Sequence, residues 1–146
     1  MKQRQTAFTL FEVLIAILIL SVGLLGLASL QANSLRSNNS SYMRSQASVL
    51  AYDMADRIRA NRTADYIAPL PNGAQLASCL TAPGCSPNSM AQNDIFEWQT
   101  AVGNTLPLGS GAITLNGNVY TISISWDDNF SDGDTAGQTF TTRFIP

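Results

Sequence analysis

The sequence contains no histidine, only two cysteines and few charged residues for its 146-residue length. Without histidine, a Ser/His or Cys/His catalytic pair and a histidine-ligated zinc site are excluded. Eight basic and ten acidic residues give a net charge of −2. Nothing therefore points to nucleic acid, whose binding depends on Lys and Arg that neutralise phosphates. The length leaves room for one domain, and the commonest ways of building an enzyme are absent.

Charge is also missing from one long segment near the amino terminus. No charged residue lies between Val13 and Ser34, and nearly every residue from Val13 to Leu30 is Val, Leu, Ile, Ala or Gly. About 20 apolar residues, each rising about 1.5 Å in a helix, cross the roughly 30 Å hydrocarbon core of a bilayer. The segment is therefore predicted to be a transmembrane helix.

Basic residues indicate how this helix is oriented. Lys2 and Arg4 precede it, and the next basic residue is Arg36. The excess of positive charge ahead of the helix places the amino terminus in the cytoplasm and the residues after Arg36 outside. A cleaved secretory signal peptide is the alternative. Its apolar region has about 7 to 15 residues and ends at a cleavage site, whereas Ala28-Ser29 lies inside a pattern that continues as helix.

Glu12 is an acid at the start of the apolar segment. A lone carboxylate within the membrane costs roughly 2.5 to 3.5 kcal/mol on insertion scales, and such residues usually mark a function. The alternative is a solvated side chain at the level of the lipid headgroups.

The residues around Glu12, from Ala7 to Ile15, read AFTLFEVLI. They resemble the class III signal of type IV pilins and type II secretion pseudopilins, which a prepilin peptidase cuts before Phe on the cytoplasmic face. The resemblance implies a leader of residues 1–7, cleavage between Ala7 and Phe8, and N-methylation of Phe8. It also implies that Glu12 neutralises the amino terminus of a neighbouring subunit, so that two charges offset each other's desolvation. Ala7 stands where the family nearly always has Gly.

Beyond the apolar segment, the helical pattern continues. Apolar residues recur at near-helical spacing at Leu35, Met43, Ala47, Leu50, Met54 and Ile58. Phe8 to Arg62 is predicted as one helix of 55 residues, about 80 Å long, whose second half packs on a head.

Charged residues in this second half are spaced for ion pairs. Asp53 and Arg57 stand at i, i+4, and Asp56 and Arg59 at i, i+3. Exposed pairs of this kind contribute about 0.2 to 0.5 kcal/mol each. The alternative is a basic strip of Arg57, Arg59 and Arg62 that meets an acidic neighbour.

Two stretches of the same helix, Ser41 to Ala47 and Leu50 to Asn61, resemble the signature of the PilV family of minor pilins, the type IV pilus modification proteins. The resemblance implies a minor pilin that helps to initiate pilus assembly and to form the tip complex. The implied partners are other minor pilins, the major pilin, a tip adhesin and the prepilin peptidase, and no cofactor or catalysis is implied. The protein would sit in the inner membrane with its head in the periplasm and then enter the pilus. A minor pseudopilin of type II secretion is the alternative, and an anchored enzyme would need a pocket with convergent polar groups.

The region from Asn61 to Asn88 is predicted to be a loop, because prolines at 69, 71, 83 and 87 break helices and strands. Cys79 and Cys85 lie within it, and we expect them to form a disulfide, since an extracytoplasmic compartment is oxidising. Two thiols without histidine are too few for structural zinc.

Ser89 to Val102 is predicted to be a short helix with Ala91, Ile95, Trp98 and Val102 on one side. Asp94 and Glu97 stand one turn apart on it and could be offered as a catalytic carboxylate pair. Acidic neighbours on a helix surface are common, so a solvated pair is the favoured interpretation.

Residues after this helix alternate between apolar and polar. Ala112 to Leu115 and Val119 to Trp126 are predicted as a hairpin closed by Asn116-Gly117-Asn118, and Thr139 to Ile145 as a third strand with Phe140 and Phe144 inward. Three antiparallel strands on the amphipathic half of the long helix make an α+β head, which is the pilin architecture. The predicted parts are thus the leader 1–7, the transmembrane and filament-packing helix 8–34, the amphipathic helix 35–62, and 63–146 with the loop, short helix and sheet.

Four carboxylates, those of Asp127, Asp128, Asp132 and Asp134, gather before the third strand. Calcium prefers flexible oxygen ligands of this kind, but the spacing does not match an EF-hand loop, because Phe130 stands at a ligand position and the closing Glu is missing. A solvated acidic turn is therefore favoured over a calcium site.

Overall fold

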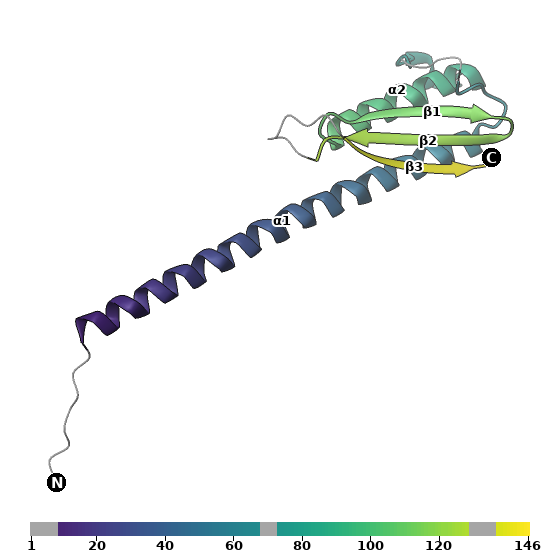
Figure 1. Ribbon diagram of the computed structural model, residues 1–146. Helices are drawn as coiled ribbons and strands as arrows, with labels where there is room; N and C mark the ends of the chain where they lie inside the picture. Colours follow the sequence, from purple (N-terminus) through teal and green to yellow (C-terminus); the bar gives the residue numbers. More distant parts are fainter. Residues whose placement is uncertain (1–8, 68–72, 129–136) are drawn as a thin grey trace, which may run out of the picture. The chain divides into compact units, whose positions relative to one another are not determined.

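The computed structural model describes residues 9–67, 73–128 and 137–146 (Figure 1). In these ranges the elements are α1 (Leu10–Ala60), a short 3-10 helix η1 (Ala77–Cys79), α2 (Pro87–Thr105), β1 (Ser110–Asn116), β2 (Val119–Trp126) and β3 (Gln138–Phe144). A long apolar helix followed by a small antiparallel sheet confirms the predicted α+β pilin fold. The chain forms two units, which meet between Asn39 and Ser40 and are described separately.

The first unit contains the amino-terminal part of α1. Thr9 precedes the helix and caps it, because the backbone N–H of Glu12 donates to the Thr9 hydroxyl at 3.3 Å and to the Thr9 carbonyl at 3.1 Å. Such a cap satisfies one of the N–H groups that the first helical turn leaves unpaired. The helix ends at Ala60, two residues before the predicted end at Arg62.

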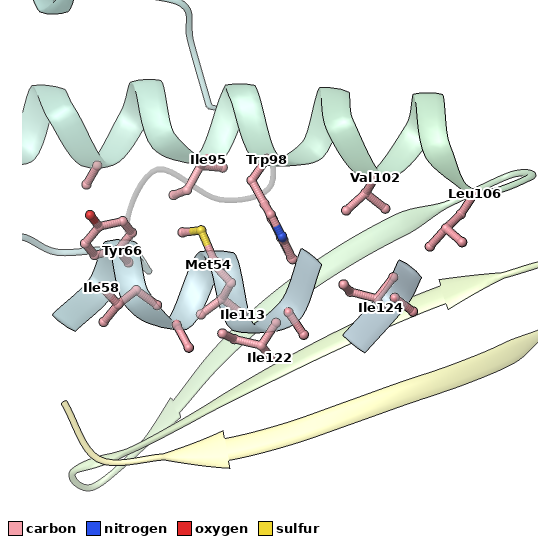
Figure 2. Close-up of a cluster of buried hydrophobic side chains, with 14 of the residues drawn as sticks. Met54, Ile58, Tyr66, Ile95, Trp98, Val102, Leu106, Ile113, Ile122 and Ile124 are labelled. Carbon is pink, nitrogen blue, oxygen red and sulfur yellow. The ribbon is translucent and has the colours of Figure 1, made fainter. Parts of the chain in front are cut away.

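The second unit is a head with one hydrophobic core. Helix α1 contributes its last buried turns, with Ala47, Ala51, Met54, Ala55 and Ile58. Figure 2 shows side chains of α1, of α2 and of the inner sheet face pointing into the same cluster. The labelled side chains of α2 and the sheet in it are Ile95, Trp98, Val102, Ile113, Ile122 and Ile124. Of the stripe predicted from the sequence, Ala47, Met54 and Ile58 are core, and Met43 and Leu50 pack partly buried against it. Leu35, the first residue of that stripe, is exposed.

The sheet is antiparallel throughout, with the order β1-β2-β3. The predicted hairpin forms, but its turn differs from the prediction. Asn116 is the last residue of β1 and pairs with Val119, so Gly117 and Asn118 alone form the turn. Of these two, only Gly117 has a positive φ, of 59°. This is the pattern of a type II′ turn, which favours Gly at its first central position.

The prediction that Pro87 ends regular structure is wrong. Helix α2 begins at Pro87, where the Ser86 hydroxyl caps it by accepting the Ser89 N–H at 3.3 Å. Proline is tolerated in the first turn because its missing N–H would have no helical partner there. The helix continues to Thr105, three residues past the predicted end.

Gly111 allows β1 to approach α2 closely. A Cβ at this position would overlap the six-membered ring of Trp98. The Trp98 indole is fully buried, and its Nε1–H donates to the Leu50 carbonyl of α1 at 2.9 Å. Trp98, which belongs to α2, therefore lies against both α1 and β1, and the missing side chain at Gly111 makes room for its ring.

Candidate functional site

The apolar part of α1 is the first candidate surface. Every residue from Thr9 to Asn39 is exposed in the isolated chain. This part holds an 18-residue window with a mean hydropathy of 2.8, long and apolar enough to cross a membrane. Gly23 and Gly26 lie within it, and the helix runs through both. The segment has the composition of a membrane span and contributes nothing to the core of the head.

Glu12 lies at the start of this surface. It shares one helix face with Val13, Ala16, Ile17 and Leu20, and together they line a shallow hollow. The small side chain of Ala16, one turn further on, leaves space beside the carboxylate. The two residues of the predicted cleavage site, Ala7 and Phe8, lie outside the described residues.

An ionic cluster centred on Arg57 links α1 to α2. Arg57 Nη1 lies 2.9 Å from Asp94 Oδ1 and 2.9 Å from Glu97 Oε2, and its Nε lies 3.1 Å from Asp53 Oδ2. The Asp94 side chain is only 11% exposed. Three carboxylates thus converge on one guanidinium, which presents several N–H donors in a rigid plane.

This cluster shifts the pKa values of its members. Burial lowers the pKa of Arg57, but hydrogen bonds to Glu97 and Asp94 outweigh it and leave the pKa raised. The hydrogen bond from Arg57 lowers the pKa of Glu97. Burial, followed by the hydrogen bond to Asp94, raises the pKa of Tyr66. Arg57 and Glu97 are therefore charged and Tyr66 is neutral at neutral pH in the folded head.

Tyr66 and two asparagines extend the cluster into the loop between the helices. The Tyr66 hydroxyl donates to Asp94 Oδ2 at 2.7 Å. Asn93 Nδ2 donates to Glu97 Oε1 at 2.9 Å, and its Oδ1 accepts the backbone N–H of Leu76 at 3.1 Å. Asn61 Nδ2 donates to the Pro87 carbonyl at 2.8 Å. The polar network thus holds both ends of the loop on the helices.

Both ion pairs predicted within α1 form, Asp53 with Arg57 and Asp56 with Arg59, the latter at 2.7 Å. Arg57 also reaches α2, while Arg59 lies over the Phe144 ring, 4.8 Å from its centroid, and Arg62 Nε donates to the Arg59 carbonyl. The three arginines therefore all contact groups of their own head, as the favoured interpretation of solvated ion pairs within the helix expects for Arg57 and Arg59.

Asp94 and Glu97 are not the solvated pair that the sequence favoured, because Asp94 is buried and both carboxylates bind Arg57. Both carboxylates accept hydrogen bonds from the same guanidinium, and Asp94 also accepts one from Tyr66. Sequence reasoning missed this arrangement because Arg57 and Asp94 are 37 residues apart. The one available signal was their placement on the inner sides of two amphipathic helices.

Cys79 and Cys85 form the predicted disulfide. The predicted loop around them contains the short helix η1, which the sequence did not indicate. The bridge closes a small loop immediately before α2 begins.

The acidic segment after β2 is only partly described. Asp128 Oδ2 accepts the Ser40 hydroxyl at 2.7 Å, and its Oδ1 accepts Trp126 Nε1–H at 2.6 Å. Asp127 donates its backbone N–H to the Pro107 carbonyl at 2.9 Å. Asp132 and Asp134 lie outside the described residues. Within the described ranges, no group of three or more Cys, Asp or Glu residues is placed to hold a metal.

Comparison with known families gives two consecutive matches. The family model for the prokaryotic N-terminal methylation motif matches residues 2–28. The family model for the type IV pilin Tt1218 matches residues 29–96. The second match contains Arg57, Asp94 and the disulfide. Neither a curated protein nor a solved structure matches the chain.

Proposed function

We propose that the chain is a type IV pilin, a structural component of a pilus, and more narrowly a minor pilin that helps to initiate assembly and forms part of the tip complex. The matches to the N-terminal methylation motif and to the type IV pilin model support this proposal. The proposed partners of the chain are other minor pilins, the major pilin and a tip adhesin. The alternative is a minor pseudopilin of a type II secretion system.

The observation that carries the proposal is the exposed apolar part of α1. Fourteen large apolar side chains between Leu10 and Leu30 are exposed in the isolated chain. Burying each contributes roughly 1.5 to 3 kcal/mol, so this surface requires a covering of lipid or of other helices. A pilin meets both in turn, first in the inner membrane and then among the helices of neighbouring subunits.

Processing of the amino terminus follows from the methylation motif, which implies a prepilin peptidase substrate. We place the cut between Ala7 and Phe8, with N-methylation of Phe8. Cleavage removes Lys2 and Arg4 and creates an amine four residues before Glu12. The carboxylate of Glu12, beside the hollow at Ala16, would then bind the amino terminus of a neighbouring subunit. Pairing two charges in a low-dielectric bundle offsets part of the desolvation of each.

The assignment to a minor, tip-associated role rests on the resemblance to PilV. That resemblance covers the part of α1 that carries Met54, Arg57 and Ile58, which build the core and the ionic cluster of the head. We place this head in the periplasm, because the basic residues ahead of α1 favour a cytoplasmic amino terminus.

Two measurements on the protein in its natural host test the proposal. Mass spectrometry of the mature amino terminus should find N-methyl-Phe8, whereas a start downstream of Leu30 would show secretory cleavage and contradict it. Quantitative proteomics of sheared pili should find the chain at a small fraction of the major pilin. Recovery with secretion components in place of pili would favour the pseudopilin alternative.

A further inference from the structure

Strand β3 forms one edge of the sheet. In the described part of the chain its sole strand neighbour is β2, and Figure 1 shows it (yellow) along the border of the sheet. Edge strands offer unpaired backbone groups to other chains, and proteins usually protect them with proline, bulges or several charges. The seven residues of β3 contain no proline and one charge, and their pairing with β2 is continuous. This edge lacks most of the usual protection.

The register shows which backbone groups face outward. Asn116 and Val119 close the two-residue turn, so they form a hydrogen-bonded pair. Along an antiparallel ladder, hydrogen-bonded and non-hydrogen-bonded pairs alternate. Val119 and Thr121 therefore direct their N–H and C=O groups toward β1, and Tyr120 and Ile122 direct theirs toward β3.

The same alternation of inward and outward backbone groups continues in β3. Thr142 and Phe144 lie opposite Ile122 and Tyr120, so they bond to β2. The residues between and beside them, Thr139, Thr141 and Arg143, direct their backbone groups away from the sheet. Three residues thus direct their N–H and C=O groups outward along the edge, and within the described ranges no other strand pairs with them.

Side chains at the edge define what would fit there. Phe140 and Phe144 pack against the core but are only half-buried at the inner side of the edge, where Arg59 of α1 lies over the Phe144 ring. On the outer side, Arg143 is exposed and lines a shallow hollow with Thr114, Asn116, Val119 and Thr121. Arg143 makes no ion pair within the described ranges, and no acidic residue lines that hollow.

We propose that an extended segment of a different pilus subunit adds to the sheet along β3. Its apolar residues would alternate on the side of Phe140 and Phe144, and an acidic residue would face Arg143. Backbone pairing supplies affinity in this mode and the alternating side chains supply specificity. This inference rests on the proposed function, which supplies other subunits as partners.

Charge complementarity favours a different subunit over a second copy of this chain. Antiparallel pairing of β3 with itself about Thr141 would place Arg143 opposite Thr139 of the other copy. That pairing brings no acid to the guanidinium. A partner with Asp or Glu at this position would neutralise it, and cross-strand pairs of opposite charge are stabilising.

The test replaces the chromosomal gene with variants of the full-length chain. Thr141→Pro removes an outward N–H and leaves the ladder to β2 intact, because proline is tolerated on edge strands. Thr141→Val is the matched control, since it keeps the N–H and loses only the hydroxyl contact to Ser123 at 3.3 Å. The amount of chain in sheared pili should fall roughly five- to tenfold for proline, as expected for a lost backbone hydrogen bond with a steric clash, and stay unchanged for valine.

A second pair of variants tests the charge without altering the backbone. Arg143→Glu should reduce incorporation, and Arg143→Lys should preserve it. This pair keeps the inference testable even where the proline variant fails to fold. A photo-crosslinker at position 139, with one at Ser123 on β2 as the control, should form its product with an alternating segment of another subunit.

The outcomes separate the two proposals. Crosslinking to β3 of a second copy, or wild-type incorporation of both Thr141→Pro and Arg143→Glu, would overturn the inference about the edge and leave the pilin role intact. Absence of the wild-type chain from sheared pili would instead overturn the proposed function.

Discussion

Arg57 Nη1 and Asp94 Oδ1 lie 2.9 Å apart, although they belong to different helices and are separated by 37 residues. This ion pair lies in the partly buried space between α1 and α2, where Tyr66 donates to the other oxygen of the same carboxylate. It is the point at which the long helix is held to the rest of the head by charge.

Replacing Arg57 should destabilise the head. Arg57→Ala leaves the mostly buried Asp94 and the nearby Glu97 without their cation, at an expected cost of about 2 to 3 kcal/mol, below the fully buried case because Arg57 is 29% exposed. Asp56→Ala is the control, because its pair with Arg59 is exposed and should contribute less than about 1 kcal/mol. Urea unfolding of the full chain in detergent, followed by tryptophan fluorescence, measures both. Equal losses would contradict the central role of Arg57.

The Glu97 carboxylate should make the head less stable at acidic pH than at neutral pH. Arg57 holds the pKa of Glu97 below its ordinary value of 4.5. A group with a lowered folded-state pKa stabilises the fold above its unfolded pKa, and the stabilisation is lost as pH falls through the folded value. The difference in unfolding free energy between wild type and Glu97→Gln should thus be full at pH 7 and shrink below pH 4.5. A difference independent of pH would show that the carboxylate charge has no part in it.

Gly111 should tolerate no side chain. Gly111→Ala places a methyl group on the buried ring of Trp98. This overpacks the core, and the free energy of unfolding should fall by about 1 to 3 kcal/mol. Gly103→Ala is the matched control in α2, where the nearest atom would be 3.9 Å from the new Cβ. Because alanine favours helices, this control should raise stability by about 0.5 to 1 kcal/mol. Thermal unfolding of the two variants should therefore shift in opposite directions.

Glu12 should matter for assembly and not for processing. Glu12→Ala is expected to insert in the membrane and to be cut at Phe8, because the apolar segment and the leader are unchanged. It should be lost from sheared pili, since it cannot pair with a neighbouring amino terminus. Glu12→Asp, which keeps the charge on a shorter side chain, should retain part of the incorporation. Normal amounts of Glu12→Ala in pili would reject the charge-pairing role.

Helices and strands whose apolar residues recur at regular spacing could be predicted from the sequence. The charge gap after Glu12 and the apolar stripe through Met54 indicated α1, and alternation from Tyr120 to Trp126 indicated the central strand. Periodicity works at these positions because each residue's burial follows directly from the geometry of its own element.

Features that depend on distant residues could not be predicted. The sequence alone indicates that Pro87 breaks a helix, whereas in the structure Ser86 caps the helix that begins at Pro87. The sequence alone indicates that Arg57 is an exposed partner of Asp53, whereas in the structure it also binds Asp94 and Glu97 of α2. Asp128 reads as one of several acids in a turn, whereas its two oxygens accept hydrogen bonds from Ser40 and Trp126. In each case the deciding contact is made by the tertiary fold.

The hydrogen bond from Trp98 to the Leu50 carbonyl has a mechanical consequence. Together with Arg57 and with Asn61, which directly follows the helix, it attaches the carboxyl-terminal turns of α1 to the rest of the head at successive positions along the chain. A load pulling along the helix axis would strain these attachments in parallel, as in shear, so that none fails alone. Detaching these turns from the rest of the head would require all three attachments to break together.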